Sequence, residues 1–392
     1  MTTTLSTHPI DAQTPITTVD ELENHLHQAA ALELSTIPLY LYAAYSIQTQ
    51  GTYQWAAGMS AFRTIRSVVI EEMLHLCLVR NLLTAIGRGT GFKLYDETIV
   101  PTYPSPMLHR VPTLMLELEP CTTGLMRDVF MPLELPAKSG APAQSDQYNT
   151  IGQFYAAITK GFETLSQPDL WAHAQPELQY NRAYWNQDGG GKPLVVTDLP
   201  SALGAITTIV EQGEGTDPHN AEVPMNPADP AFGFEELSHY AKFSRIAEGV
   251  DVIGSVWPVP TNPTRADYDG PIAALAELFD AAYCYVLCMI DAIYEASNAD
   301  VTPGNHSERY GLERTFIAAM GGLLYPIGDL LVRQPGGPDG CNAAPTFGWY
   351  AYDDASSRKD QLTALCDAVL ADFPALGGDD GVRQLIGRLP SV

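Results

Sequence analysis

A carboxylate and an imidazole lie three residues apart inside one apolar stretch of helical period, residues 68–79. In an α-helix, residues i and i+3 share a face, so Glu72 and His75 point the same way. An ionised carboxylate on a core-facing stripe is costly unless it is paired or coordinates a metal. The stretch therefore predicts a buried helix that carries either an ion pair or a pair of metal ligands.

Glu71 is the rival of Glu72, because it lies one helical turn before His75. The face of the predicted helix that carries Glu71 is more polar and reads as solvated, since it also holds Arg63, Thr64, Ser67 and Leu78. We therefore predict that Glu72 is the glutamate that faces inward.

Two other predicted helices place acids in apolar patterns. Residues 19–48 form the first, and Glu33 lies within its apolar stripe. Residues 199–215 form the second, where Glu211 and Glu214 both follow an apolar run. Both helices are predicted to turn a carboxylate toward the core.

The opening motif returns in a predicted helix over residues 232–243. Glu235-Glu236-x-x-His239 matches Glu71-Glu72-x-x-His75 without a gap. By the same helical argument Glu236 and His239 face inward, whereas Glu235 shares a more polar face with Lys242. We interpret the repeat as two matching half-sites.

Four predicted helices thus offer one Glu, one Glu-x-x-His, one Glu and one Glu-x-x-His. This is the ligand set of di-iron and di-manganese carboxylate bundles of the ferritin-like type. Oxygen-rich ligation with two imidazoles favours two iron ions, with manganese or a mixed iron–manganese pair as the alternative, and leaves zinc open. Structural ion pairs are the competing interpretation. The predicted metal ligands are Glu33, Glu72, His75, Glu211, Glu236 and His239, with Glu214 as an alternative ligand.

Several short motifs also resemble a known family. They are Glu33-Leu34-Ser35-Thr36-Ile37-Pro38, Glu71-Glu72-Met73-Leu74-His75, Tyr103-Pro104-Ser105-Pro106, Ile151-Gly152-Gln153-Phe154-Tyr155, Glu211-Gln212-Gly213-Glu214-Gly215 and Ser238-His239-Tyr240. Over residues 19–350 the chain resembles the ferritin-like proteins related to the N-terminal region of iminophenyl-pyruvate dimer synthases of bisindole biosynthesis. The resemblance implies a di-metal site at the six positions above. It does not carry over the synthase reaction, because those synthases are longer chains with a haem-dependent portion.

We expect an all-α, ferritin-like four-helix bundle with long Pro-rich insertions and additional C-terminal helices. Residues 1–18 form a tail, 19–262 the bundle with an insertion around 92–196, and 263–392 the C-terminal helices, packed on the same domain. The expected function is that of an O2-dependent oxidoreductase acting on a small, amino-acid-derived secondary metabolite. Its bridging and terminal carboxylates would be Glu33, Glu72, Glu211 and Glu236. The alternative is a metal-binding or scaffold protein without turnover.

The amino-acid composition limits which binding partners and which compartment we expect for this chain. The net charge of −25 over 392 residues argues against nucleic acid and anionic membranes. The longest apolar stretch, residues 273–296, contains four acids, which we take as evidence against a membrane span. Six cysteines do not form a disulfide framework, and no leader segment is visible, so we expect a cytoplasmic protein. We expect a small-molecule substrate and leave a homodimer open.

Overall fold

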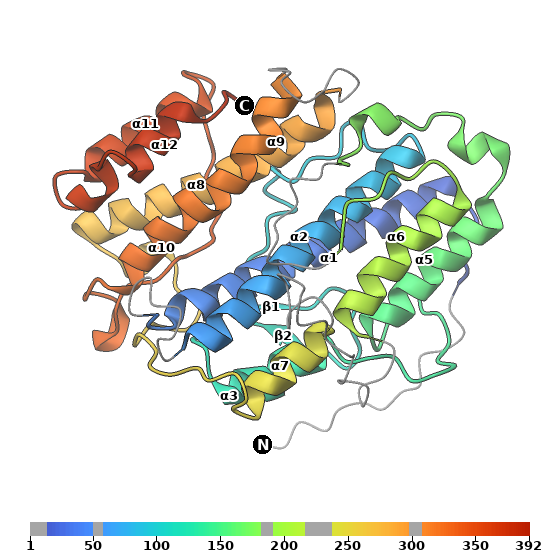
Figure 1. Ribbon diagram of the computed structural model, residues 1–392, viewed down its shortest axis with the longest axis horizontal. Coiled ribbons are helices and arrows are strands. Elements are labelled where there is room, and N and C mark those ends of the chain that lie inside the picture. Colours follow the sequence, from blue (N-terminus) through green and yellow to red (C-terminus); the bar gives the residue numbers. More distant parts are fainter. Residues whose placement is uncertain (1–13, 50–57, 182–190, 216–236, 298–307) are drawn as a thin grey trace, which may run out of the picture.

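Four long helices pack side by side and form a bundle (Figure 1). They are α1 (Val19–Ser46), α2 (Met59–Ala85), α5 (Ile151–Leu165) and α6 (Leu199–Gly213). α1 packs against α2 and α5, and α6 packs against the same two helices, which closes the bundle. The computed structural model describes residues 14–49, 58–181, 191–215, 237–297 and 308–392.

Local sequence signals set where these helices begin. Thr18 and Glu21 form a reciprocal capping box at the start of α1. Asp198 caps α6, which has a proline in its first turn. Thr150 caps α5 by accepting a hydrogen bond from the Gln153 backbone. These caps satisfy backbone N–H groups that a helix leaves without a partner.

The fourth helix of the bundle is not the one that the sequence analysis expected. α5 lies within the stretch treated there as an insertion, yet it packs against α1 and α6. The helix expected over 232–243 begins only at His239, because Ser238 has an extended backbone and its side chain caps the helix. This helix, α7 (His239–Ala247), is short, and His239 occupies its first position. The expectation that His239 lies in the interior of a helix over residues 232–243 is therefore wrong.

The Pro-rich segment between α2 and α5 passes beneath α7. It contains a two-stranded antiparallel sheet of β1 (Ser105–Pro106) and β2 (Met115–Leu116). It then forms α3 (Thr123–Leu125), a π-helical turn (Met126–Phe130) and α4 (Met131–Leu133), all of which contact α7. This packing places Glu134, which follows α4, beside His239 at the start of α7.

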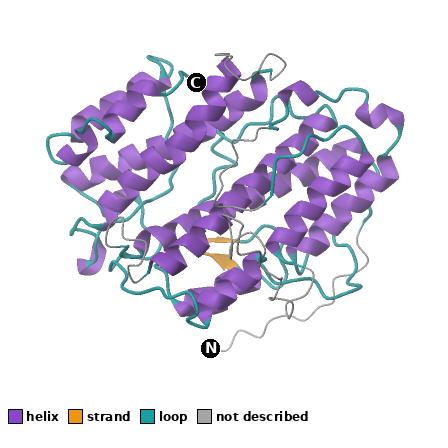
Figure 2. Ribbon diagram, in the orientation of Figure 1, coloured by secondary structure: helices purple, strands orange, loops and turns teal. Residues whose placement is uncertain are grey.

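The C-terminal helices form a second layer beside α1 and α2 (Figures 1 and 2). α8 (Gly270–Glu295) packs against α9 (Glu308–Ala319), α10 (Tyr325–Val332) and α11 (Arg358–Val369), and α10 contacts α1. A π-helical turn (Met320–Leu324) separates α9 from α10, where the sequence predicted one helix. The last helix is α12 (Val382–Arg388). Short 3-10 helices complete the described chain: Pro168–Trp171, Pro176–Leu178, Arg265–Asp267, Pro338–Gly340 and Pro374–Gly377.

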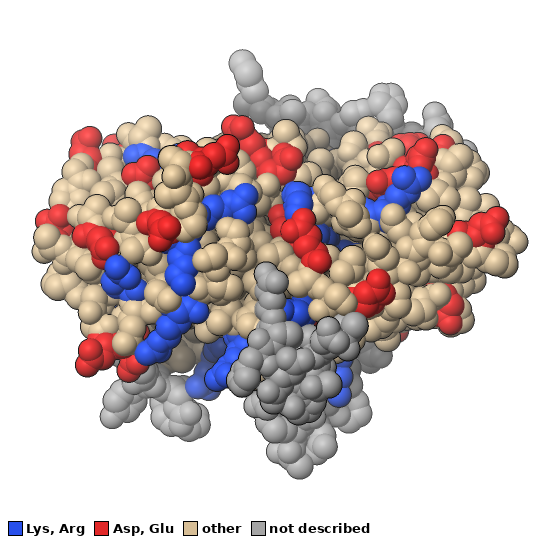
Figure 3. All heavy atoms as spheres, turned by 90° about the horizontal axis from the view of Figure 1, so that it is seen from above, with Lys and Arg blue, Asp and Glu red and all other residues tan. Residues whose placement is uncertain are grey.

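Among the described residues, two helical segments are long and apolar enough to cross a membrane by length and composition alone. In α8 the most apolar part is 78% buried, so within this fold α8 is a core helix. The expectation that this stretch does not span a membrane stays a prediction. The other segment, Arg309–Val332, is 44% buried over its most apolar part. On the face in Figure 3, acidic and basic side chains are interspersed.

Candidate metal centre

Two buried histidines face each other beside the middle of α1 and α2, with a glutamate between them. The rings of His75 and His239 stack with centroids 5.3 Å apart. Glu72 places Oε1 2.9 Å from Nδ1 of His239 and Oε2 3.7 Å from Nδ1 of His75. One ligand atom from each of the three residues lies within 4.8 Å of the others. This spacing could hold a metal ion.

A further glutamate approaches each histidine. Glu33 Oε2 lies 3.5 Å from Nδ1 of His75, and Glu134 Oε1 lies 3.6 Å from Nδ1 of His239. Each Nδ1 atom therefore faces two carboxylates, and Glu72 is common to both. We call Glu33, Glu72, His75, Glu134 and His239 the Glu/His cluster; all five are buried.

The outer nitrogens of the two imidazoles contact different groups. His75 Nε2 lies 3.2 Å from Oε1 of Gln212, whereas His239 Nε2 lies 2.9 Å from Oε2 of Glu71. Lys242 Nζ in turn contacts the same Glu71 oxygen at 2.5 Å. Since an amide oxygen and a carboxylate accept hydrogen bonds, both Nε2 atoms donate. In the neutral imidazoles, the form that binds metal, each Nδ1 lone pair is therefore directed into the cluster, as in metal-binding histidines.

Buried tyrosines hold the two outer glutamates. The Tyr155 hydroxyl donates to Oε1 of Glu33. The Tyr40 hydroxyl donates to Oε1 of Glu134 at 2.5 Å. These bonds leave the second oxygen of Glu33 directed at His75 and restrict the rotation of both carboxylates.

The charges within the cluster shift its pKa values strongly. Burial raises the pKa of Glu33 to about 7, and the nearby Glu72 carboxylate adds to this effect. Burial alone would raise the pKa of Glu72, but its contacts with His239 and His75 hold it below the usual range. Burial opposes the charged form of His75, yet Glu33 and Glu72 raise its pKa to about 9. The pKa of His239 is likewise raised, by Glu134, Glu71 and Glu72 against the effect of burial.

This donor set fits divalent cations. Three carboxylates around two Nδ1 atoms need positive charge among them, which protons on the imidazoles supply in the metal-free protein. His239 Nδ1 makes no hydrogen bond of good geometry, although it lies 2.9 Å from Glu72. A cation between these atoms would satisfy both, and metal binding would release the imidazole protons.

The structure brings together four of the six predicted ligands, Glu33, Glu72, His75 and His239. Glu236, and Glu235 with it, lies outside the described residues. Glu211 is exposed on α6, so the expectation that it faces the core is wrong.

Glu214, the alternative ligand, is buried, but its carboxylate accepts hydrogen bonds from the backbone N–H groups of Gly152 and Ala137. It ties the end of α6 to α5 and to the chain after α4. Burial raises the pKa of Glu214 to about 7.

The expectation that Glu71 is solvated is wrong, and one residue was missed. Glu71 is buried because it forms an ion pair with the buried Lys242 beneath His239. Glu134 was not predicted, since it lies in a Pro-rich segment without helical period. Its sequence signal was a single acid within the apolar run 129–135.

A four-helix bundle with buried Glu and His side chains at its centre is the hallmark of the ferritin-like class. A model of the family described as ferritin-like matches residues 26–248, more than half of the chain. The chain therefore belongs to the ferritin-like family. A crystal structure of a ferritin-like protein from Caulobacter vibrioides has the same fold, with a TM-score of 0.54 at 23% identity, over 85% of this chain and 99% of that chain.

Two curated relatives confirm the resemblance that the sequence motifs indicated. The chain is 27% identical to dichlorochromopyrrolate synthase of Lentzea aerocolonigenes, over 85% of this chain and 36% of the relative. It is also 27% identical to 2-imino-3-(indol-3-yl)propanoate dimerase of Chromobacterium violaceum, over 89% of this chain and 36% of the relative. The chain thus spans about a third of the length of each relative.

Proposed function

We propose that this protein is a di-metal, O2-dependent oxidoreductase that acts on a small, amino-acid-derived metabolite. The observation that carries the proposal is the position of Glu72 between the Nδ1 atoms of two histidines, each of which faces a second carboxylate. Glu33, Glu72 and His75 would hold one metal ion, and Glu72, Glu134 and His239 the other. Two bound iron ions, or manganese as the alternative, would supply the binding and reduction of dioxygen.

The residues around the cluster orient the ligands and control protons. Gln212 and Glu71 fix the imidazole tautomers through Nε2, which keeps both Nδ1 atoms available to metal. Tyr40 and Tyr155 hold the outer carboxylates in place. Burial of the ligands keeps bulk water from these groups and strengthens every charge interaction among them.

The substrate class rests on the relatives. The name of one relative specifies dimerisation of 2-imino-3-(indol-3-yl)propanoate, which is the imine of an indole-bearing amino acid. We extend to this chain only the class of compound, a small amino-acid-derived metabolite. The dimerisation itself is not part of the proposal, because the chain spans about a third of that relative.

Metal loading followed by exposure to O2 tests the proposal. The purified protein is titrated anaerobically with Fe(II), bound iron is counted, and O2 uptake and near-ultraviolet absorbance are then followed. We expect two irons per chain and O2 consumption, both lost in Glu72→Ala. Glu211→Ala is the matched control, since Glu211 is exposed on α6, and it should behave like the unmodified protein.

The other outcomes are equally informative. Two bound irons without O2 consumption would favour the alternative, a ferritin-like metal-binding or scaffold protein. A folded protein that binds no metal would refute both functions and leave the Glu/His cluster as a structural ion-pair network.

A further inference from the structure

A surface-open cavity lies on the side of α1 and α2 that faces the C-terminal layer. Its volume is about 430 Å³, within the usual range for small-molecule sites. The exposed residues Arg66 and Gly321 lie at its walls, so the cavity reaches the surface. Most of the wall is apolar and includes Leu41, Tyr45, Phe62, Met73, Phe316 and Met320.

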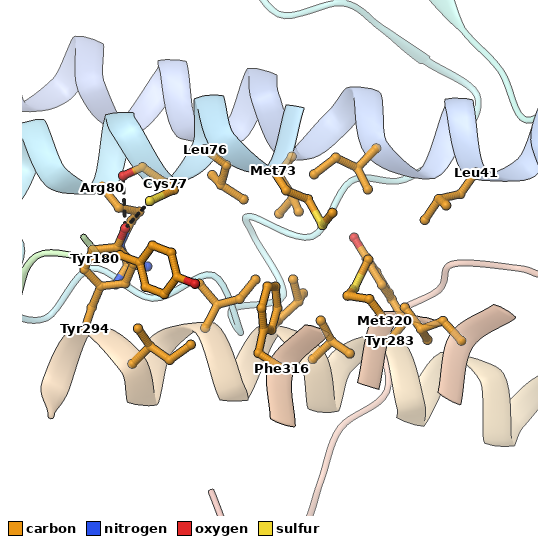
Figure 4. A pocket seen from close by; sticks show the side chains of 17 residues that line it. Leu41, Met73, Leu76, Cys77, Arg80, Tyr180, Tyr283, Tyr294, Phe316 and Met320 are labelled. Carbon is orange, nitrogen blue, oxygen red and sulfur yellow. Dashed lines mark hydrogen bonds between the residues drawn. The ribbon is translucent and has the colours of Figure 1, made fainter. Parts of the chain in front are cut away.

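A second, narrower space adjoins this cavity. Four residues line both, namely Leu41, Met73, Phe316 and Met320. The narrow space has a volume of about 50 Å³ and lies between α1 and α2 on one side and α8 and α9 on the other (Figure 4). The cavity and the narrow space thus share one apolar wall.

Tyr283 of α8 carries a polar group on the wall of the narrow space. It is 2% exposed, and within the described part of the chain its hydroxyl makes no hydrogen bond. In Figure 4 its side chain points toward the layer of α1 and α2, between Met73 and Leu41. An unpaired buried hydroxyl is destabilising, so a hydrogen-bond acceptor brought to it by a ligand would be stabilised there.

The side chains that line the cavity are also suited to bind an aromatic ligand. Met73 and Met320 are flexible, polarisable side chains that make favourable contacts with aromatic rings. Met320 begins the π-helical turn between α9 and α10, a type of irregularity that is frequent at functional sites. Among the described residues that line the narrow space, Arg80 is the one charged side chain, and it is already paired with Asp291. This lining favours an uncharged ligand over a charged one.

We propose that the larger cavity binds a small, uncharged aromatic molecule whose carbonyl oxygen reaches past Met73 and Leu41 and accepts a hydrogen bond from Tyr283. The site is separate from the Glu/His cluster, which lies on the side of α1 and α2 that faces α6 and α7. It therefore goes beyond the proposed oxidoreductase function and stands independently of it.

The test uses 6-propionyl-2-dimethylaminonaphthalene, an uncharged aromatic ketone whose fluorescence reports both apolar surroundings and hydrogen bonding to its carbonyl. We expect saturable 1:1 binding to the metal-free protein with enhanced emission. Tyr283→Phe removes the donor and should weaken binding by about tenfold, the equivalent of one hydrogen bond near 1.4 kcal/mol. It should also shift the emission of the bound probe to shorter wavelength.

Tyr285→Phe is the matched control on the same helix, because the Tyr285 hydroxyl already donates to the Pro390 carbonyl. It should leave probe binding unchanged while lowering the melting temperature. Tyr283→Phe should not lower the melting temperature, since it removes an unpaired hydroxyl. Absence of saturable binding, equal affinity of Tyr283→Phe and the unmodified protein, or displacement of the probe by Mn(II) at the Glu/His cluster would each overturn the proposal.

Discussion

Replacement of Lys242 by methionine should destabilise the protein far more than a typical lysine substitution. Lys242 is fully buried, and its Nζ lies 2.5 Å from the Glu71 carboxylate. The variant removes the ammonium group that neutralises this carboxylate, while Glu71 must still accept the hydrogen bond from His239. Loss of one partner of a buried ion pair is costly because the remaining charge stays away from water.

The magnitude follows from the separation and the burial. At an effective dielectric constant of about 20, Coulomb's law gives an attraction of roughly 7 kcal/mol across this distance, before desolvation is subtracted. Measured losses on breaking buried pairs are about 3–5 kcal/mol, and we expect the free energy of unfolding to fall by this amount at pH 7.

The pH dependence supplies a second signature. Burial raises the pKa of Glu71, but Lys242 and His239 together hold it below its usual value. The contribution of this carboxylate to stability is therefore present above its ordinary pKa of 4.5 and lost as the pH falls. The difference between the unmodified protein and Lys242→Met should shrink in acid.

Urea unfolding of the metal-free protein, followed by circular dichroism at several pH values, measures these differences. The control is Glu71→Gln/Lys242→Met, which removes both charges and keeps an acceptor for His239. We expect the double variant to recover at least half of the lost stability. A single variant that loses less than about 1 kcal/mol, or a double variant as unstable as the single, would contradict the ion-pair account.

Three further measurements address other contacts. The pKa of Glu214 is raised from 4.5 to about 7, so the stability that its protonated form contributes is fully present below pH 4.5 and is lost as the pH rises through 7. The free energy of unfolding of the unmodified metal-free protein should therefore fall by about 3 kcal/mol as the pH rises through this range, and that of Glu214→Gln much less. Urea unfolding at pH 5 and pH 8 measures both. Tyr155→Phe removes the donor to Glu33 and should weaken metal binding by about tenfold in a metal titration, whereas Tyr148→Phe, whose hydroxyl has no hydrogen-bond partner in the described structure, should leave it unchanged. Ser238→Ala removes the cap of α7 and should cost about 1 kcal/mol of unfolding free energy and weaken metal binding; unchanged values for both would show that the cap does not position this helix.

The sequence alone determined the helices with strong period and the ligands within them. Glu33, Glu72 and His75 lie where the apolar stripes of α1 and α2 predicted, because the spacing of residues along a helix fixes which side chains share a face. Capping residues such as Thr18 also set helix starts correctly. These features depend on neighbours within a few residues, which a sequence displays directly.

Only the tertiary structure decided the other half of the cluster. Periodicity does not say which of two nearby acids, Glu211 or Glu214, the end of a helix turns inward. It also gives no information about Glu134, which reaches His239 because the Pro-rich chain folds back beneath α7. Lys242 was assigned to the more polar face of its helix because its buried partner, Glu71, lies far away in the sequence. Charged side chains become core residues when the fold supplies a partner of opposite charge, and that pairing is a property of packing rather than of local sequence.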